Sequence, residues 1–386
     1  MKKWMVVLMV VLVGLLVTAC GPEETPAPET GTDVTAEPEV EVTRAPEATV
    51  ETEVPEAGNG GDRALTVMTH NSFDASEEVI AQFQEACGCT VQFLQAGDAG
   101  LMLNQALLSK GNPVADVIYG VDNTFLSRAL NGDILEAYES PLLAEIPDNL
   151  ELDPTYQMLP VDYGDVCLNY DKEWFEEAGL APPSGLEDLA DPAYQGLTVV
   201  ENPATSSPGL AFLLATIGHF GEEGDYTYLD YWADLRANEV LVTDGWEDAY
   251  YGSFTYASDG DRPIVVSYAS SPPVEVFFAS EPFDEAPTGV VTGDQSCFRQ
   301  VEFVGILAGT ENRDLAEQWI DFMLGETFQE DIPLKMFVFP ANENAELPEV
   351  FVEFSVIPES PVFVDVDTIE EKRQQWIEAW VQTVLR

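Results

Sequence analysis

Two adjacent serines, Ser206 and Ser207, lie where a polar turn meets an apolar run in ENPATSSPGLAFLL, residues 201–214. Pro208 follows them and suits the first turn of a helix, because its fixed φ is helical and no amide partner is needed there. The serine hydroxyls could cap this helix, attack a substrate as a nucleophile, or hold a ligand at the helix N-terminus. The rest of the chain must decide among these three interpretations.

A serine nucleophile needs a base and an oxyanion hole, and the sequence indicates neither. ATSSPG lacks the usual Gly-x-Ser-x-Gly elbow, and Pro208 removes an amide that such an elbow would use. Only two histidines, His70 and His219, are present to act as a base. The chain also lacks a Gly-x-x-x-x-Gly-Lys phosphate loop and a dinucleotide fingerprint. Carboxylate pairs for glycoside hydrolysis are too abundant to be informative. The sequence therefore does not predict an enzyme.

The loop VTDGWEDAYYGSF, residues 242–254, favours binding instead. It places Trp246 and the tandem tyrosines Tyr250 and Tyr251 among three carboxylates. Aromatic faces and carboxylates together suit a flat cation, which they attract by stacking and by cation–π interaction.

A third loop, SYASSPP, adds Tyr268, Ser270 and Ser271 directly after an apolar strand pattern. Each of the three loops alone is typical of a helix cap, a core aromatic or a turn. Three such loops in succession, each after a strand, favour a ligand cleft.

The elements that must position these loops alternate between strand and helix. Strand patterns alternate with helix patterns in the order 64–73, 76–87 (helix), 90–97, 100–109 (helix) and 115–122. This alternation predicts parallel β-α-β units and hence an α/β domain. Later strands that end in polar or aromatic groups are 165–171, 197–203 and 263–272. Because ligands bind beyond the carboxyl ends of strands in open α/β sheets, we expect these loops to face one cleft.

The last part of the chain predicts packing helices. Residues 314–332 and 367–386 each have an apolar face at helical spacing. Ile369, Trp376 and Trp380 lie on related turns of the second helix, which indicates core packing and not ligand contact.

Charge excludes one class of partner. The 386 residues carry a net charge of −55, with 70 acidic residues against 15 Lys and Arg. Such a chain repels phosphate backbones, so nucleic acid is not an expected partner. It attracts cationic ligands, although an acidic surface that serves solubility or a salty habitat explains the charge equally well.

The N-terminus resembles a bacterial lipoprotein signal. Lys2 and Lys3 precede an apolar stretch at 4–17, and LVTAC places Cys20 after small residues. This pattern predicts cleavage before Cys20, its lipidation, and a domain held at the outer side of the cell membrane. The following Pro-, Thr- and Glu-rich segment, residues 21–62, predicts an extended acidic linker.

From about Leu65 to Arg386 the chain resembles the thiamine-binding proteins of bacterial ABC importers, which have the type II periplasmic binding protein fold. The resemblance is carried by TVMTHNSF, EACGCTVQF, ADVIYGVDN, NPATSSPGL, VTDGWEDAY, VVSYASSP, QVEF, IPLKMFVFPAN and RQQWIEAW. It implies an α/β fold of two lobes with a hinge and a central ligand cleft. The implied segments are a signal peptide at 1–20, a linker at 21–62, a first lobe at 63–160 and 296–386 that includes the C-terminal helix, and a second lobe at 161–295.

The resemblance also implies a function. A monomer without cofactor or resident metal would capture thiamine, or its phosphates, and pass it to a permease with a separate ATPase. Trp246 and Tyr268 would pack against the aromatic rings and the cation, and Asp98 would pair with the aminopyrimidine or the thiazolium. Ser206 and Ser207 would hold the hydroxyethyl or phosphate end. The implied contacts are Asp98, Ala99, Ser206, Ser207, Trp246, Tyr268, Ala269, Ser270, Ser271 and Pro272, and further candidates are His70, Asn71, Asp122, Asp165, Tyr250 and Phe337.

Several positions depart from the family pattern. A pocket tyrosine is His70 here, its acidic neighbour is Asn71, and a tryptophan near the C-terminal strand is Phe337. A second tyrosine, after SP, falls on Val274. Asp165 is an additional acid that we expect to compensate for the lost one.

Four cysteines remain beside Cys20, and an even number in an oxidising compartment favours disulfides without defining their connectivity. A zinc site is not favoured, because Cys87 and Cys89 have no histidine near them in the sequence. The resemblance matches these two to a family pair. We predict that the other two, Cys167 and Cys297, form a disulfide with each other.

Other ligands, and one other class of protein, remain open. Iron receptors of this fold use neighbouring tyrosines, and Tyr250 with Tyr251 is such a pair that His70 or a carboxylate could complete. A polyamine would also suit a pocket of acids and aromatic rings. A surface enzyme acting on glycans or esters would be indicated by turnover that Ser206→Ala abolishes.

Overall fold

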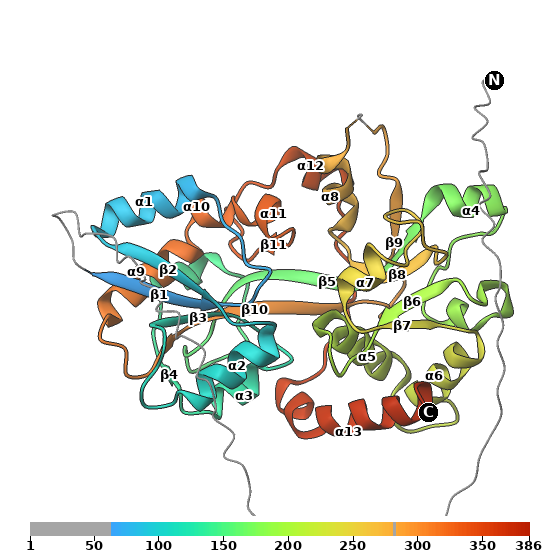
Figure 1. The fold of residues 1–386 in the computed structure, drawn as a ribbon, viewed down its shortest axis with the longest axis horizontal. Helices are drawn as coiled ribbons and strands as arrows, with labels where there is room; N and C mark the ends of the chain where they lie inside the picture. The colour runs from blue at the N-terminus through green and yellow to red at the C-terminus, as the bar shows by residue number, and fades with distance from the viewer. Residues whose placement is uncertain (1–62, 281–282) are drawn as a thin grey trace, which may run out of the picture. The chain divides into compact units, whose positions relative to one another are not determined.

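The computed structural model describes residues 63–280 and 283–386 (Figure 1). The predicted signal peptide, the lipidation site Cys20 and the linker at 21–62 lie outside the described residues. Among the described residues, none of the helices is both long and apolar enough to span a membrane.

Eleven strands of the described part form one mixed sheet, whose main order is β2-β1-β3-β10-β5-β8-β6-β7. These strands are β1 (Ala64–Thr69), β2 (Thr90–Gln95), β3 (Val117–Asp122), β5 (Leu159–Asp171), β6 (Thr198–Glu201), β7 (Leu241–Thr243), β8 (Ile264–Tyr268) and β10 (Phe298–Leu307). The short strands are β4 (Leu135–Glu136), which pairs with β10, and β9 (Thr288–Val291) and β11 (Phe339–Pro340), which pair with β5.

Strand direction differs between the ends and the centre of the sheet. β1 runs parallel to β2 and β3, and β6 runs parallel to β7 and β8, as the alternation of strands and helices predicts. In the centre, β5 and β10 run antiparallel to each other and to their neighbours β8 and β3. The prediction of parallel β-α-β units is therefore correct only for the two ends.

The described part also contains thirteen α-helices. They are α1 (Glu77–Cys87), α2 (Ala99–Leu108), α3 (Leu126–Leu130), α4 (Lys172–Ala178), α5 (Ser207–Phe220), α6 (Tyr228–Ala237), α7 (Trp246–Tyr250), α8 (Ser271–Phe278), α9 (Arg313–Leu324), α10 (Glu326–Gln329), α11 (Ile332–Lys335), α12 (Glu349–Phe354) and α13 (Val366–Val384). Three 3-10 turns are Pro141–Glu145, Glu187–Ala190 and Pro192–Tyr194.

The buried apolar side chains form two main clusters. The first core gathers side chains from β1, β3, α2 and α9, with Trp319 among them. The second core gathers side chains from β8, α5, α6 and α13, with Trp232 among them. Among the described strands, only β5 and β10 contribute to both: in β5, Val161 belongs to the first core and Val166 to the second. These two strands carry the chain from one core to the other (Figure 1).

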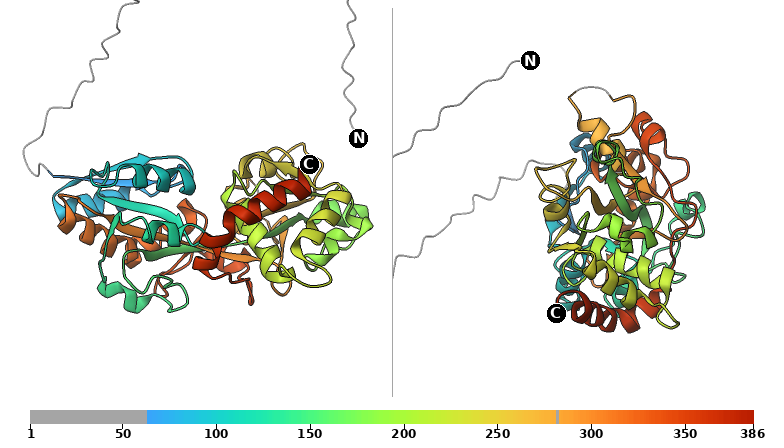
Figure 2. Two further views of the ribbon diagram at one scale, coloured as in Figure 1. Left: turned by 90° about the horizontal axis from the view of Figure 1, so that it is seen from below. Right: turned by 90° about the vertical axis from the view of Figure 1, so that its right-hand side faces the viewer.

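The C-terminal helix differs from its predicted place. We expected residues 296–386 as a whole to complete the first lobe, but α13 packs on α6 in the second core (Figures 1 and 2). The ring centroids of Trp380 and Trp232 are 5.4 Å apart. The tryptophan face of α13 is thus core, as its spacing predicts, but it belongs to the other cluster.

Candidate functional site

The three predicted binding loops lie at one edge of the sheet. They follow β6, β7 and β8, which are mutually parallel and so end on the same side. The first two loops touch, because the Thr205 hydroxyl donates to the Asp244 carbonyl (2.7 Å) and the Asn202 amide donates to the Thr243 carbonyl (2.9 Å). The structure therefore brings together the loops that the sequence placed at strand ends.

Ser206 caps α5. Its backbone is extended and its hydroxyl accepts a hydrogen bond from the amide of Gly209 (3.2 Å). Pro208 lies in the first turn, where it needs no partner. A plain cap is therefore part of what this serine does.

Gly209 lets α5 approach β6 closely. A Cβ atom at this position would lie 2.7 Å from the carbonyl oxygen of Glu201, a backbone atom that cannot turn away. We expect Gly209→Ala to lower the free energy of unfolding by about 1–3 kcal/mol, the usual cost of overpacking. Urea unfolding measures the effect. Gly245→Ala is the control, because a Cβ there meets no atom within 4 Å, and an equal loss in both variants would contradict the prediction.

Ser207 links α5, which packs in the second core, to β3, which packs in the first core. Its hydroxyl donates to Asp122 Oδ2 at the end of β3 (2.8 Å). The Gln300 amide of β10 donates to both of these groups, at 2.8 Å each. The Tyr268 hydroxyl donates to the other side of Gln300, its Oε1 atom, at 3.2 Å. Three predicted site residues are thus joined through Gln300, which the sequence reasoning missed.

Trp246 is the first residue of α7, and its indole is held by one hydrogen bond and by one stacked ring. Its Nε1 donates to the Ser267 hydroxyl (3.0 Å), and its indole stacks on Tyr250 with centroids 4.9 Å apart and planes 25° apart. Tyr250 is buried and its hydroxyl donates to Glu275. Tyr250, predicted as a ligand contact, therefore lies behind Trp246 as its support, whereas Tyr251 is 58% exposed.

The loop after β8 is engaged within the protein. The Ala269 amide donates to the Asp165 carbonyl (2.8 Å), and the Ser270 hydroxyl donates to the Phe337 carbonyl (2.6 Å). The Ser271 hydroxyl pairs with that of Ser267 at 2.9 Å, and Pro272 follows in the first turn of α8. These residues therefore shape the loop, and their hydroxyls are bonded within the protein.

Two predicted contacts near the first core, Asp98 and Asn71, accept hydrogen bonds from nearby backbone amides. Asp98 caps α2 by accepting from the Leu101 amide (2.8 Å), with Ala99 buried as the first helical residue. The Asn71 side chain accepts from the Gly97 amide (3.0 Å). The predicted pairing of Asp98 with a positive group would have to use a carboxylate that already accepts one hydrogen bond.

His70 lies beside a buried acid. Its Nε2 is 3.4 Å from Glu302 Oε1, and only 8% of the residue is exposed. Burial lowers the pKa of His70, but the neighbouring Glu302 carboxylate outweighs this and raises it. The ring packs on Gly120, where φ is +96° and an added Cβ would lie 2.2 Å from the imidazole. A glycine is therefore needed beneath this histidine.

The central strands carry an acidic cluster. The buried Tyr119 hydroxyl donates to Asp162 and also to Glu302 Oε2 (3.3 Å). Burial and the charge of Glu302 raise the pKa of Asp162 well above its usual range, while the charge of His70 helps to lower that of Glu302. The sequence reasoning missed Asp162 and Glu302. The sequence does contain a signal for them, because each is an acid among the apolar residues of a strand, Asp162 in β5 and Glu302 in β10.

Asp165 has a different role from the one predicted. Its carboxylate accepts from Arg299 Nε (3.0 Å) and Nη2 (2.9 Å) across the β5–β10 pair. The arginine also lies over the Tyr163 ring, 4.8 Å from its centroid. Asp165 is therefore neutralised within the protein, and the expectation that it replaces a lost ligand acid is not supported by this geometry.

Both cysteine pairs are bridged in the structure. Cys167 in β5 is joined to Cys297, just before β10, and Cys87 is joined to Cys89 at the end of α1. Within the described residues, no group of three or more His, Cys, Asp or Glu side chains is arranged to hold a metal ion.

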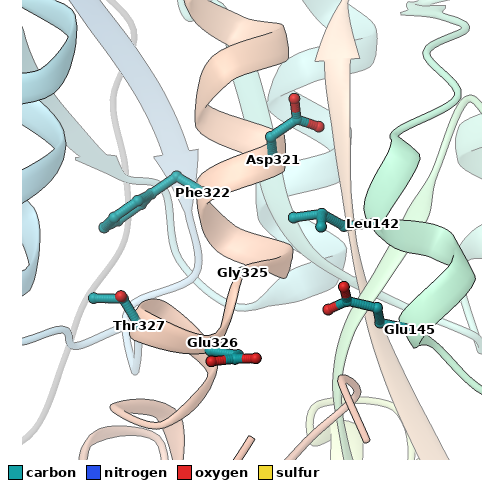
Figure 3. Close-up of a pocket in the computed structure, with 7 residues that line it drawn as sticks. All are labelled: Leu142, Glu145, Asp321, Phe322, Gly325, Glu326 and Thr327. Atoms are coloured by element: carbon teal, nitrogen blue, oxygen red, sulfur yellow. The ribbon is translucent and has the colours of Figure 1, made fainter. Parts of the chain in front are cut away.

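Two surface hollows of the described part do not include Ser206, Ser207 or Trp246 in their lining. One is lined by Leu142, Glu145, Asp321, Phe322, Gly325, Glu326 and Thr327 (Figure 3). Asp321, one of its three acids, already accepts from Ser140 (2.6 Å) and from Tyr138 (2.9 Å). A second hollow, which includes Tyr170, Lys172 and Glu353, shares only Pro272 with the predicted contacts. Ser207 and Asp122 of the predicted site instead pair with each other.

Residues 112–354 match the family described as Bacterial extracellular solute-binding protein. The chain belongs to this family. Solute-binding proteins are not enzymes, so the prediction that this chain is not an enzyme is confirmed. The match and the mixed α/β sheet also confirm the predicted fold class.

Relatives with known ligands extend the comparison. The chain is 27% identical over 330 residues to the Thiamine-binding periplasmic protein of Brucella suis biovar 1 (strain 1330), covering 83% of this chain and 92% of that one. It is 25% identical to the Putrescine/cadaverine-binding protein of Pseudomonas aeruginosa, covering 67% and 74%.

Solved structures give the same picture. A periplasmic thiamin binding protein matches with a TM-score of 0.71 and 26% identity over 84% of this chain and 96% of that chain. The ferric binding protein from Campylobacter jejuni matches with a TM-score of 0.66 and 19% identity over 83% and 99%, which shows a shared fold only. The resemblance to thiamine-binding proteins is thereby confirmed as one of sequence and of fold.

Proposed function

We propose that this solute-binding protein captures thiamine, or a thiamine phosphate, outside the membrane and delivers it to an ABC permease. The observation that carries the proposal is the meeting of three loops at the ends of β6, β7 and β8, where the Trp246 ring, the Ser206–Ser207 helix start and Tyr268 lie together. The thiamine-binding relatives support the same ligand.

Each part of the ligand has a matching group. The indole of Trp246, backed by Tyr250, offers a flat face for the aromatic rings and the thiazolium charge. The net charge of −55 favours a cation over a neutral solute, because a strongly acidic protein attracts cations. The start of α5, with the positive end of its helix dipole and the hydroxyls of Ser206 and Ser207, suits the hydroxyethyl or phosphate end.

Capture would exchange protein contacts for ligand contacts. The Ser207 hydroxyl now donates to Asp122, so a ligand that uses Ser207 must break this link between the cores. We propose that the two cores move as lobes about β5 and β10, with boundaries near residues 160 and 296 as predicted. Lipidation of Cys20 would hold the domain at the membrane through the linker at 21–62, close to the permease.

Calorimetry with four ligands tests the proposal. The protein is titrated with thiamine, thiamine monophosphate, ferric citrate and spermidine. We expect thiamine or its phosphate to bind at micromolar concentration or tighter. Binding of spermidine or iron alone would replace the proposal by one of the alternatives. The tandem-tyrosine iron site is not favoured, because the Tyr250 hydroxyl is already bonded to Glu275.

A further inference from the structure

Helix α8 is linked to both rings of the stack formed by Trp246 and Tyr250, directly to Tyr250 and through Ser267 to Trp246. The Tyr250 hydroxyl donates to Glu275 Oε1 on α8. The indole Nε1 of Trp246 donates to Ser267, whose hydroxyl pairs with Ser271 of α8 at 2.9 Å. Ser271 and Glu275 are four residues apart in one helix and so share a face. One helix face therefore supports both ends of the aromatic stack.

Glu275 links three elements. Besides Tyr250 of α7, the Thr288 hydroxyl of β9 donates to Glu275 Oε2 at 2.5 Å. α8 itself packs against β9, while α7 packs against β8 (Figure 1). Both carboxylate oxygens thus accept a hydrogen bond from a hydroxyl, and hydrogen bonds to an ionised acceptor are about twice as strong as neutral ones.

We propose that Glu275 is a positioning residue that holds the Trp246–Tyr250 stack in place for ligand binding and does so in its ionised form. The inference rests on the proposed function in taking Trp246 as a ligand contact. The ionised carboxylate accepts strong, charge-assisted hydrogen bonds from both hydroxyls, whereas a protonated one carries a donor of its own and holds them by weaker, neutral hydrogen bonds.

The residues around Glu275 place its ionisation near neutral pH. Burial raises the pKa of Glu275 to about 7, against the hydrogen bonds from Thr288 and Tyr250, which lower it. Asp171 raises the pKa further and Lys172 lowers it. The ionisable groups that face Glu275 are Tyr250, Tyr251 and Tyr256 beside it, and Asp171 and Lys172 at the end of β5 and the start of α4. Burial and the Glu275 charge raise the pKa of Tyr250 well above its usual range, so it stays a donor.

Ligand affinity should increase with pH, because the ionised form of Glu275 holds the stack. As pH rises through about 7, Glu275 ionises, both hydroxyls are held, and the stack becomes fixed. Ligand affinity should therefore rise by about fivefold between pH 6 and pH 8. This change corresponds to part of the free energy of one charge-assisted hydrogen bond. The quaternary thiazolium charge of thiamine does not titrate, so it does not imitate this change.

The test compares Glu275→Gln with the unchanged protein. Fluorescence of the ligand-free protein is recorded from pH 5.5 to 8.5, and subtraction of the Trp246→Phe spectrum isolates the Trp246 signal. We expect this signal to titrate near pH 7 in the unchanged protein and to stay flat in Glu275→Gln, whose thiamine affinity should match the low-pH value of the unchanged protein throughout. Glu247→Gln removes an exposed acid next to Trp246 and should leave the titration in place.

The outcomes separate this inference from the proposed function. A Trp246 signal that titrates equally in Glu275→Gln would overturn the inference, as would full thiamine affinity at pH 8 in that variant. The near-isosteric amide keeps the shape of the side chain, and circular dichroism confirms folding. If the unchanged protein binds no thiamine, the proposed function fails, while the fluorescence titration still decides whether Glu275 controls the stack.

Discussion

Replacing Trp246 by alanine is expected to weaken thiamine binding by more than about 1.5 kcal/mol, which is over tenfold in Kd. The indole supplies the flat aromatic face of the proposed site, and aromatic anchors dominate the binding energy of such pockets. Calorimetry at a single pH above 7.5, where Glu275 is ionised, measures the loss without interference from its titration.

Two control variants interpret this result. Trp246→Phe keeps an aromatic face but loses the hydrogen bond to Ser267, so its loss should be smaller than that of alanine. Tyr251→Ala removes an exposed ring that meets Trp246 edge-on at 5.4 Å, and it should change Kd little. If Trp246→Ala lowers stability but leaves Kd unchanged, Trp246 is a core residue and the proposed site is wrong.

The second large effect is expected on stability. Arg299→Met should lower the free energy of unfolding by about 3–5 kcal/mol at pH 7, because it leaves the Asp165 carboxylate buried without its partner. The Asp165 side chain is 0% exposed, and that of Arg299 is 21% exposed, so water can do little to replace the guanidinium. Denaturant unfolding measures the loss.

The pH dependence and a double variant test the cause. Burial already raises the pKa of Asp165 with Arg299 present, and without the arginine this pKa rises further. A carboxyl with a raised pKa costs stability above its unfolded pKa and ceases to do so when protonated, so the deficit of Arg299→Met should shrink as pH falls. Asp165→Asn combined with Arg299→Met should recover most of the loss. A deficit independent of pH and unrelieved by the double variant would indicate a packing defect instead.

Local patterns predicted the elements that hold the site. The apolar runs that became β3 and β8, the helix that Ser206 caps, and the packing role of Trp376 and Trp380 all depend on neighbours within one or two turns or strands. The placing of the binding loops at strand ends also follows from order along the chain. These features could be derived because period and capping are short-range properties.

The polar pairings could not be derived in this way. Arg299 and Asp165 are 134 residues apart and meet only because β5 and β10 pair in one register. Ser207 reaches Asp122 across 85 residues, and Tyr250 finds Glu275 on another helix. No local pattern contains a strand register, so the partners of Asp165 and Tyr250 could not be predicted. The packing of α13 on the second core was not predicted for the same reason, because an amphipathic pattern indicates a buried face but not the element that it packs against.

The bridge between Cys167 and Cys297 makes a ring of the chain. It closes a loop over a sequence separation of 130 residues, which contains β6, β7, β8 and the helices α4 to α8. In the oxidised protein, a single peptide bond cut anywhere inside this ring leaves both fragments covalently joined. A protease nick there would therefore pass unnoticed on a non-reducing gel and appear as two bands only after the thiols are restored. α13 lies outside the ring, so only noncovalent contacts, such as the hydrogen bond from Trp376 Nε1 to Glu222, attach it to the ring.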